Sequence, residues 1–160
     1  INVLLKELFE DPSIILIPQK IKPIFTWGEN TIANGDSGLL KQVFINLIRN
    51  AIQAMPEGGD LKITTQKSSK LEQSSEKPDY SRQFITVTVA DQGEGISEKN
   101  LANVFNPFFT TKDHGTGLGL SISHNIIKAH QGTIDVENDM GKGARFIIKI
   151  PCWDNELDKK

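Results

Sequence analysis

The chain has 160 residues, 38% of them hydrophobic, and its 18 Lys and Arg residues nearly balance its 20 Asp and Glu residues, for a formal net charge of -2. This length fits one domain within the usual range of roughly 100–200 residues, and the composition excludes a wholly disordered chain. The near-balance of charge argues against a nucleic-acid-binding module, and because no apolar run approaches the roughly 18 residues of a membrane span, we expect no direct membrane contact.

The cysteine content and the first residue add two expectations. The single cysteine, Cys152, cannot form an internal disulfide, and it lacks the neighbouring cysteines and histidines of a zinc site. We therefore expect a reducing, cytoplasmic setting. No signal peptide is visible, and because the sequence opens with Ile1 we expect it to begin inside a longer polypeptide.

The N-terminal third predicts two helices with an irregular stretch between them. Residues 1–10 show helix-like apolar spacing and end before Pro12. SIILI (13–17) predicts a strand, two prolines break regularity in the segment after it, and TIA (31–33) predicts a short second strand. From Asp36, a good helix N-cap, apolar residues then recur at helical spacing until Pro56.

The rest of the chain predicts four strands and two further helices. LKITTQ (61–66) and FITVTVA (84–90) alternate like half-buried strands, with a mobile polar loop over 67–83 between them. We expect Ser97 to cap a short helix through Val104, and the glycine-rich stretch 115–119 to open a helix over 120–130. TIDVE (133–137) and ARFIIKI (144–150) predict a final hairpin, followed by a charged tail over 152–160. This order predicts an α+β fold, a mixed and mostly antiparallel sheet with helices on one face.

The helix after Asp36 carries two asparagines, Asn46 and Asn50, which lie one above the other beside the apolar stripe. Asparagine is a mediocre helix former, so two of them on one face require an explanation. Their amide oxygens are hard, neutral ligands that suit a magnesium ion partly neutralised by phosphates. Two solvated surface amides explain this helix equally well.

Asp91 begins a second motif, DQGEGI (91–96), directly after a strand. A carboxylate there, followed by Gly93 and Gly95, lets the backbone approach a flat ligand closely. The carboxylate accepts from an exocyclic amine, and this contact selects adenine over guanine. An ordinary strand-to-helix turn remains the alternative, because so short a motif matches by chance.

A third motif, GTGLGLS (115–121), opens a helix with three alternate glycines. Successive backbone N–H groups at a helix N-terminus form an anion site that suits phosphate. Upstream, FNPFFTTKDH (105–114) predicts a hydrophobic hinge that carries Lys112 towards phosphate, although packing alone explains its phenylalanines equally well.

In this order and spacing the motifs resemble the ATP-binding domain of sensor histidine kinases, in the wider group of gyrase, Hsp90-type and MutL ATPases. NLIRNAIQAM resembles the N box, DQGEGI the G1 box, FNPFFTTK the F box, GTGLGLSIS the G2 box and GKGARF the G3 box. The likeness spans about residues 36–150 and is strongest to kinases of the nitrogen-regulation and sporulation type. It implies the Bergerat fold, a two-layer α/β sandwich with about three helices on one face.

The resemblance also implies an organisation and a set of site residues. Residues 1–10 would end a linker helix from a preceding dimerisation and phosphoacceptor domain, 11–151 would form the catalytic domain, and 105–119 would be its ATP lid. Asn50 is the expected Mg²⁺ ligand, and catalysis is assigned to Asn46, Asn50 and Lys112. The residues implied to bind ATP or ADP are Asn46, Asn50, Asp91, Gly93, Gly95, Ile96, Lys112, Gly115, Thr116, Gly117, Leu118, Gly119, Leu120 and Gly143.

Four positions depart from the family pattern. Gln53 replaces a common phosphate-binding lysine, so Lys112 or Arg49 must supply that charge. Ala144 and Arg145 stand where a hydroxyl residue is common, which puts one water-mediated adenine contact in doubt. Asn46 stands where the related ATPases keep a water-activating glutamate, so hydrolysis lacks a general base here and phosphoryl transfer is favoured.

The accepting histidine is expected on another domain. None of His114, His124 and His130 is followed by the acidic residue that follows a phosphoacceptor histidine, and structural roles are favoured for the last two. The resemblance thus implies that Mg-ATP phosphorylates a histidine domain of the same or a partner chain, with a response regulator downstream. It implies a homodimeric parent protein and a monomeric fragment. A hydrolysing ATPase, a serine kinase and a nucleotide-binding module without transfer are the alternatives.

Overall fold

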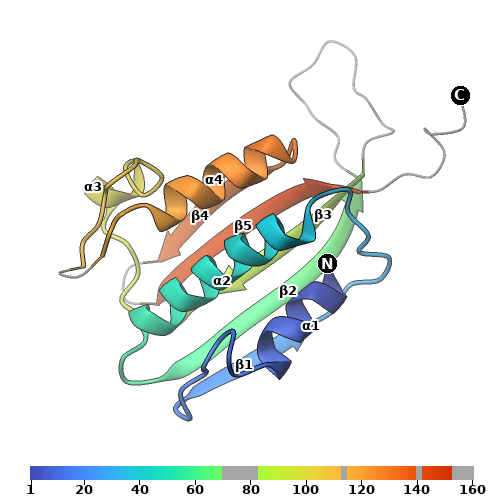
Figure 1. Ribbon diagram of the computed structural model, residues 1–160. Coiled ribbons are helices and arrows are strands. Elements are labelled where there is room, and N and C mark those ends of the chain that lie inside the picture. Colours follow the sequence, from blue (N-terminus) through green and yellow to red (C-terminus); the bar gives the residue numbers. More distant parts are fainter. Residues whose placement is uncertain (70–82, 113–114, 140–141, 153–160) are drawn as a thin grey trace, which may run out of the picture.

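A computed structural model describes residues 1–69, 83–112, 115–139 and 142–152 of the chain. In these ranges five strands form one sheet in the order β1-β2-β3-β5-β4 (Figure 1). They are β1 (Ile21–Thr26), β2 (Gly59–Ser69), β3 (Gln83–Ala90), β4 (Thr133–Asp139) and β5 (Gly143–Pro151). β1 pairs with β2 in parallel, and the other neighbours are antiparallel. The predicted mixed, mostly antiparallel sheet is confirmed.

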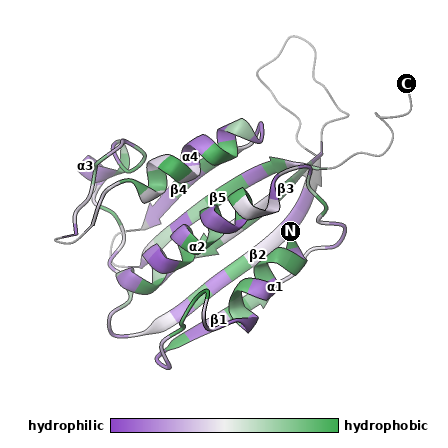
Figure 2. Cartoon of the chain, in the orientation of Figure 1, coloured by the Kyte–Doolittle hydropathy of each residue, from purple (hydrophilic) through white to green (hydrophobic). Residues whose placement is uncertain are grey.

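The long helices cover one face of this sheet, as predicted. α1 (Asn2–Glu10), α2 (Ser37–Ala54) and α4 (Gly119–Ala129) lie side by side over it, with α2 in the middle (Figure 1). Figure 2 shows hydrophilic and hydrophobic residues alternating along α2 and α4, as expected for amphipathic helices. In the described ranges no helix is long and apolar enough to cross a membrane.

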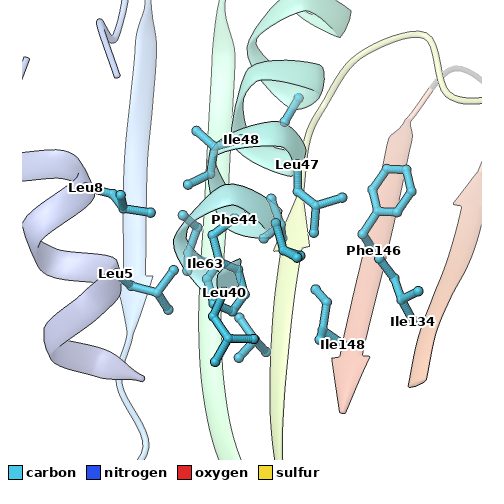
Figure 3. Close-up of a cluster of buried hydrophobic side chains, with 14 of the residues drawn as sticks. Leu5, Leu8, Leu40, Phe44, Leu47, Ile48, Ile63, Ile134, Phe146 and Ile148 are labelled. Atoms are coloured by element: carbon cyan, nitrogen blue, oxygen red, sulfur yellow. The ribbon is translucent and has the colours of Figure 1, made fainter. Parts of the chain in front are cut away.

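The core lies between the two layers (Figure 3). Phe44 and Leu47 of α2 are fully buried against strands whose alternate residues point to the helices. The start of α2 is fixed by Asp36, whose Oδ1 accepts from the Leu39 N–H at 3.0 Å. Side chains from both layers fill this core, among them Leu5, Leu8, Leu40, Ile48, Ile63, Ile134, Phe146 and Ile148.

The predictions for residues 12–35 were wrong. SIILI (13–17) is not a strand, and β1 instead spans Ile21–Thr26, where Pro23 was expected to break regularity. Among the described strands β1 lies at the edge and pairs with β2 alone, and an edge tolerates the missing N–H of a proline. The second predicted strand, TIA (31–33), is reduced to an isolated bridge between Ala33 and Cys152.

Several predicted bounds also shift. The short helix α3 spans only Glu98–Leu101, and the Ser97 side chain makes no capping hydrogen bond. α4 begins and ends one residue earlier than predicted. β2 runs on through Ser69 and β3 begins at Gln83, so both ends of the predicted loop 67–83 belong to strands, and residues 70–82 lie outside the described ranges. Cys152, expected in the tail, donates its N–H to Gln83 O at 2.8 Å, and 153–160 are not described.

Candidate functional site

Asn46 lies where α2 meets the beginning of α4. Its Nδ2 donates to Oγ of Ser123, a buried residue of α4, at 3.0 Å. A Cβ added at Gly119, the first residue of α4, would lie 2.2 Å from Asn46 Oδ1. The N-terminus of α4 therefore closes directly onto Asn46, and this approach requires glycine.

Lys112 contacts α2 one turn further along. Its Nζ donates to Asn50 Oδ1 at 3.1 Å and to Gln53 Oε1 at 2.5 Å. The residue as a whole is exposed, but its ammonium lies against α2, and desolvation there lowers the pKa of Lys112. Lys112 and Arg49 were the two cations expected to replace the lysine missing at position 53, and Lys112 is the one that contacts Gln53. Arg49 does not, because it donates to Ile14 O at 3.1 Å.

Asp91 is buried at the end of β3, with 8% of its surface exposed. Its Oδ1 accepts from the N–H groups of Gly93 at 2.9 Å and Ala144 at 3.2 Å. Desolvation raises the pKa of Asp91, and these two hydrogen bonds oppose the rise. Both hydrogen bonds that this side chain accepts within the described ranges use Oδ1, which leaves Oδ2 to meet a ligand.

Two glycines hold the Asp91 loop between α2 and β5. A Cβ at Gly93 would lie 2.4 Å from Ala54 O, at the end of α2. Gly143 has φ +105°, and a Cβ there would lie 2.0 Å from Asp91 O. Gly95 also has a positive φ, +76°. The second motif therefore packs against the C-terminus of the helix that carries the first.

Asn138 of β4 was missed by the sequence predictions. Its Oδ1 accepts from the Ile96 N–H, and its Nδ2 donates to Ile96 O, both at 2.5 Å. This pair ties the end of the DQGEGI segment to the far strand of the sheet. No local pattern indicated it, because the contact depends on where β4 lies in the sheet.

The glycine-rich segment is shaped by close backbone packing. Gly117 has φ +68°, and a Cβ there would lie 2.3 Å from the carbonyl carbon of Phe108. Phe108 itself has φ +66° and is 74% exposed. The Leu118 N–H donates to Thr116 Oγ1 at 3.4 Å, just before α4 begins. These contacts bring the N-terminus of α4 over the Asn46 side of α2.

The described histidines, His130 and His124, contact other parts of the fold. The Nδ1 of His130 lies 2.8 Å from Ile126 O, and its Nε2 accepts from the Asp36 N–H at 3.0 Å. The His124 ring packs on Phe105 with centroids 5.6 Å apart. His114 and Gly141 lie outside the described residues. Arg145 forms an exposed ion pair with Glu137 at 3.2 Å.

Comparison with protein families matches residues 35–154 to the family described as histidine kinase-, DNA gyrase B- and HSP90-like ATPase. The chain belongs to this family. The predicted family is confirmed, and an ATPase family supports ATP as the ligand of the site.

Two curated sporulation kinases are similar to this chain in sequence. Sporulation kinase A of Bacillus subtilis is 48% identical over 120 residues, which cover 74% of this chain and 17% of the relative. Sporulation kinase C of the same species is 36% identical over 94% of this chain and 33% of the relative. The chain thus spans about a third or less of these two curated relatives.

Among solved structures, the nucleotide-free catalytic domain of the histidine kinase ThkA superposes with a TM-score of 0.75. It is 35% identical, and the match covers 94% of this chain and 91% of that domain. The predicted two-layer α/β sandwich of this family is confirmed.

Proposed function

We propose that this chain binds Mg-ATP and transfers the γ-phosphate to a histidine on a separate dimerisation and phosphoacceptor domain of a two-component sensor kinase. The observation that carries the proposal is the convergence on α2. Asn46 contacts the start of α4, Asn50 contacts Lys112, and the end of α2 contacts the Asp91 loop. Groups suited to a purine, a metal ion and phosphates thus lie along one helix.

Asp91 is proposed to recognise adenine. Two backbone N–H groups fix Oδ1, so the orientation of the carboxylate is set before a ligand arrives. Oδ2 then accepts from the exocyclic amine of adenine, which guanine lacks at that position. The close approaches at Gly93 and Gly143 keep this loop in place.

Asn50 is proposed as the protein ligand of Mg²⁺. The donor chemistry fits, because its Oδ1 is a hard, neutral oxygen that already accepts from a cation, Lys112. When bound, the ion neutralises charge on the phosphates. The residues proposed to hold phosphate are Asn46, Lys112 and the backbone N–H groups of 115–120, at the N-terminus of α4.

Transfer is favoured over hydrolysis because Asn46 has no carboxylate. An amide cannot take a proton from water, so the general base expected of a hydrolysing relative is missing at this position. The residues described here instead position the phosphates and offset their charge. His124 and His130 are engaged in structural contacts, which supports an acceptor on another domain.

The proposal extends to the parent protein. Residues 1–10 would end a linker helix from the acceptor domain, 11–151 would be the catalytic domain and 105–119 its ATP lid. The acceptor domain would belong to the same or a partner chain of a homodimer, and a response regulator would take the phosphate onward. We propose a cytoplasmic setting and a monomeric fragment.

Phosphorylation in trans tests this function. The chain is mixed with a separately purified histidine domain of a related sensor kinase, Mg²⁺ and radiolabelled ATP. We expect acid-labile, base-stable label on the histidine domain, and less of it with Asp91→Ala. Acid-stable label would instead indicate a serine kinase, steady phosphate release by the chain alone an ATPase, and binding without transfer a nucleotide-binding module.

A further inference from the structure

Lys112 is held by two acceptors that lie one turn apart on α2. Asn50 Oδ1 and Gln53 Oε1 are both amide oxygens, at 3.1 Å and 2.5 Å from Nζ. An ammonium group has three donors and no acceptor, so two of its three donors are used here. The resting position of this cation is therefore set by two residues of the helix.

The oxygen that holds Lys112 is also the oxygen assigned to the metal. Two cations on one amide oxygen repel each other, and the repulsion is stronger near a partly desolvated surface than in bulk water. A metal ion bound at Asn50 Oδ1 would therefore weaken the hold of this oxygen on Lys112.

The second acceptor, Gln53, affects how firmly Lys112 is held beside Asn50. A glutamine accepts from the ammonium without adding charge, whereas a lysine at position 53 would repel it. Lys112, the cation proposed to bind phosphate, thus lies on the segment before α4, and Gln53, which accepts from it, lies on α2.

We propose that the Lys112 ammonium and the metal ion of the bound nucleotide compete for Asn50 Oδ1, and that Gln53 sets the strength of this competition. The inference rests on the proposed function and concerns regulation of the same site. Entry of the metal displaces Lys112 from Asn50 and frees its charge for the phosphates. Without the Gln53 acceptor, Lys112 is held less firmly beside Asn50, so the metal displaces it more easily.

Calorimetry with ADP in Mg²⁺ and with ADP in EDTA tests the competition. The ratio of the two affinities measures how much the metal adds to binding. In Gln53→Leu we expect this ratio to rise about three- to tenfold, because a smaller fraction of the protein holds Lys112 on Asn50. Gln42→Leu, at an exposed position three turns earlier on α2, is the matched control and should leave the ratio unchanged.

A double-mutant cycle separates this mechanism from a direct effect of Gln53. Lys112→Met removes the competing cation, so Gln53→Leu should add nothing to the ratio in that background. The backbone order parameter of Lys112, measured by NMR without nucleotide, should fall in Gln53→Leu and stay unchanged in Gln42→Leu.

The outcomes separate this inference from the proposed function. An unchanged or lower ratio in Gln53→Leu, or an equal rise with and without Lys112, would overturn the competition while nucleotide binding stood. A wild-type chain that binds ADP in neither condition would overturn the proposed function and the competition with it.

Discussion

Gly119 and Asn46 touch so closely that a Cβ on Gly119 would lie 2.2 Å from Asn46 Oδ1. The Asn46 side chain cannot turn away freely, because its Nδ2 is held by Ser123 Oγ. The first residue of α4 and the first asparagine of α2 are thus fitted to each other. This contact joins two of the three predicted motifs.

Gly119→Ala should break this fit. Asn46 must give up its hydrogen bond to Ser123, which costs about 1 kcal/mol of unfolding free energy, and nucleotide affinity should fall because α4 moves. Denaturant unfolding and calorimetry measure the two effects. Gly38→Ala, in the first turn of α2, is the control and should bind nucleotide normally. Unaltered affinity in Gly119→Ala would show that α4 does not hold the ligand.

Asp91→Ala should abolish the preference for ATP over GTP, because the acceptor for the adenine amine is lost. It should also lower the free energy of unfolding by about 1–3 kcal/mol, since the N–H groups of Gly93 and Ala144 lose their partner. Competition binding with the two nucleotides measures the preference. An intact preference would contradict the placement of the purine at Asp91.

The free energy of unfolding should depend on pH because of Asp91. Burial raises the pKa of Asp91 above its ordinary value of 3.8. Between the two pKa values the folded protein keeps a proton that the unfolded chain has released. The Asp91 contribution to stability is therefore present at low pH and is lost as pH rises through the folded-state pKa.

The comparison with Asp91→Asn, which cannot titrate, isolates this pH dependence. The unfolding free energy of the wild type minus that of the variant should fall as pH rises from 3.8 and then level off. Urea unfolding across that range measures the difference. A difference that stays flat or increases with pH would contradict the raised pKa.

Asn138→Ala should loosen the Asp91 loop from β4. Two hydrogen bonds to the Ile96 backbone disappear, at a cost of about 1–3 kcal/mol in unfolding free energy, and nucleotide affinity should fall. Asn138→Asp keeps the acceptor for the Ile96 N–H and loses the donor, so we expect an intermediate loss. If both variants bind like the wild type, the pair has no part in shaping the site.

Asn50→Ala should weaken Mg-ATP more than metal-free ATP, because the amide oxygen assigned to the metal is removed. Calorimetry with Mg²⁺ and with EDTA gives both affinities. Asn125→Ala, at an exposed position of α4, serves as the control. Equal losses in the two conditions would mean that Asn50 is not a metal ligand.

Local patterns predicted the elements whose signals lie in their own residues. The spacing of Leu40, Phe44 and Leu47 and the cap at Asp36 predicted α2, and period-two alternation predicted β3. β1 escaped prediction because Pro23 is tolerated only at an edge, and the edge position follows from pairing with β2 far along the chain.

The site residues likewise fall into those that the local sequence predicted and those that only the tertiary structure placed. Asn46, Asn50 and Asp91 stood out in the sequence because a polar residue in an apolar helix, or a carboxylate at a strand end, is unusual on local grounds. Sequence alone could not predict that Lys112, and not Arg49, contacts Asn50, nor that Asn138 binds the Ile96 backbone. Each of these contacts joins residues more than 30 positions apart.

We propose that one Mg-ATP molecule lies along α2, with its purine at Asp91 and its phosphates at Asn50 and the start of α4. Titration of the chain with Mg-ATP in a calorimeter tests it most directly. We predict saturable binding of one nucleotide per chain, weakened in Asp91→Ala and in Asn50→Ala. A wild-type titration with no saturable heat, or equal binding by all three proteins, would contradict it.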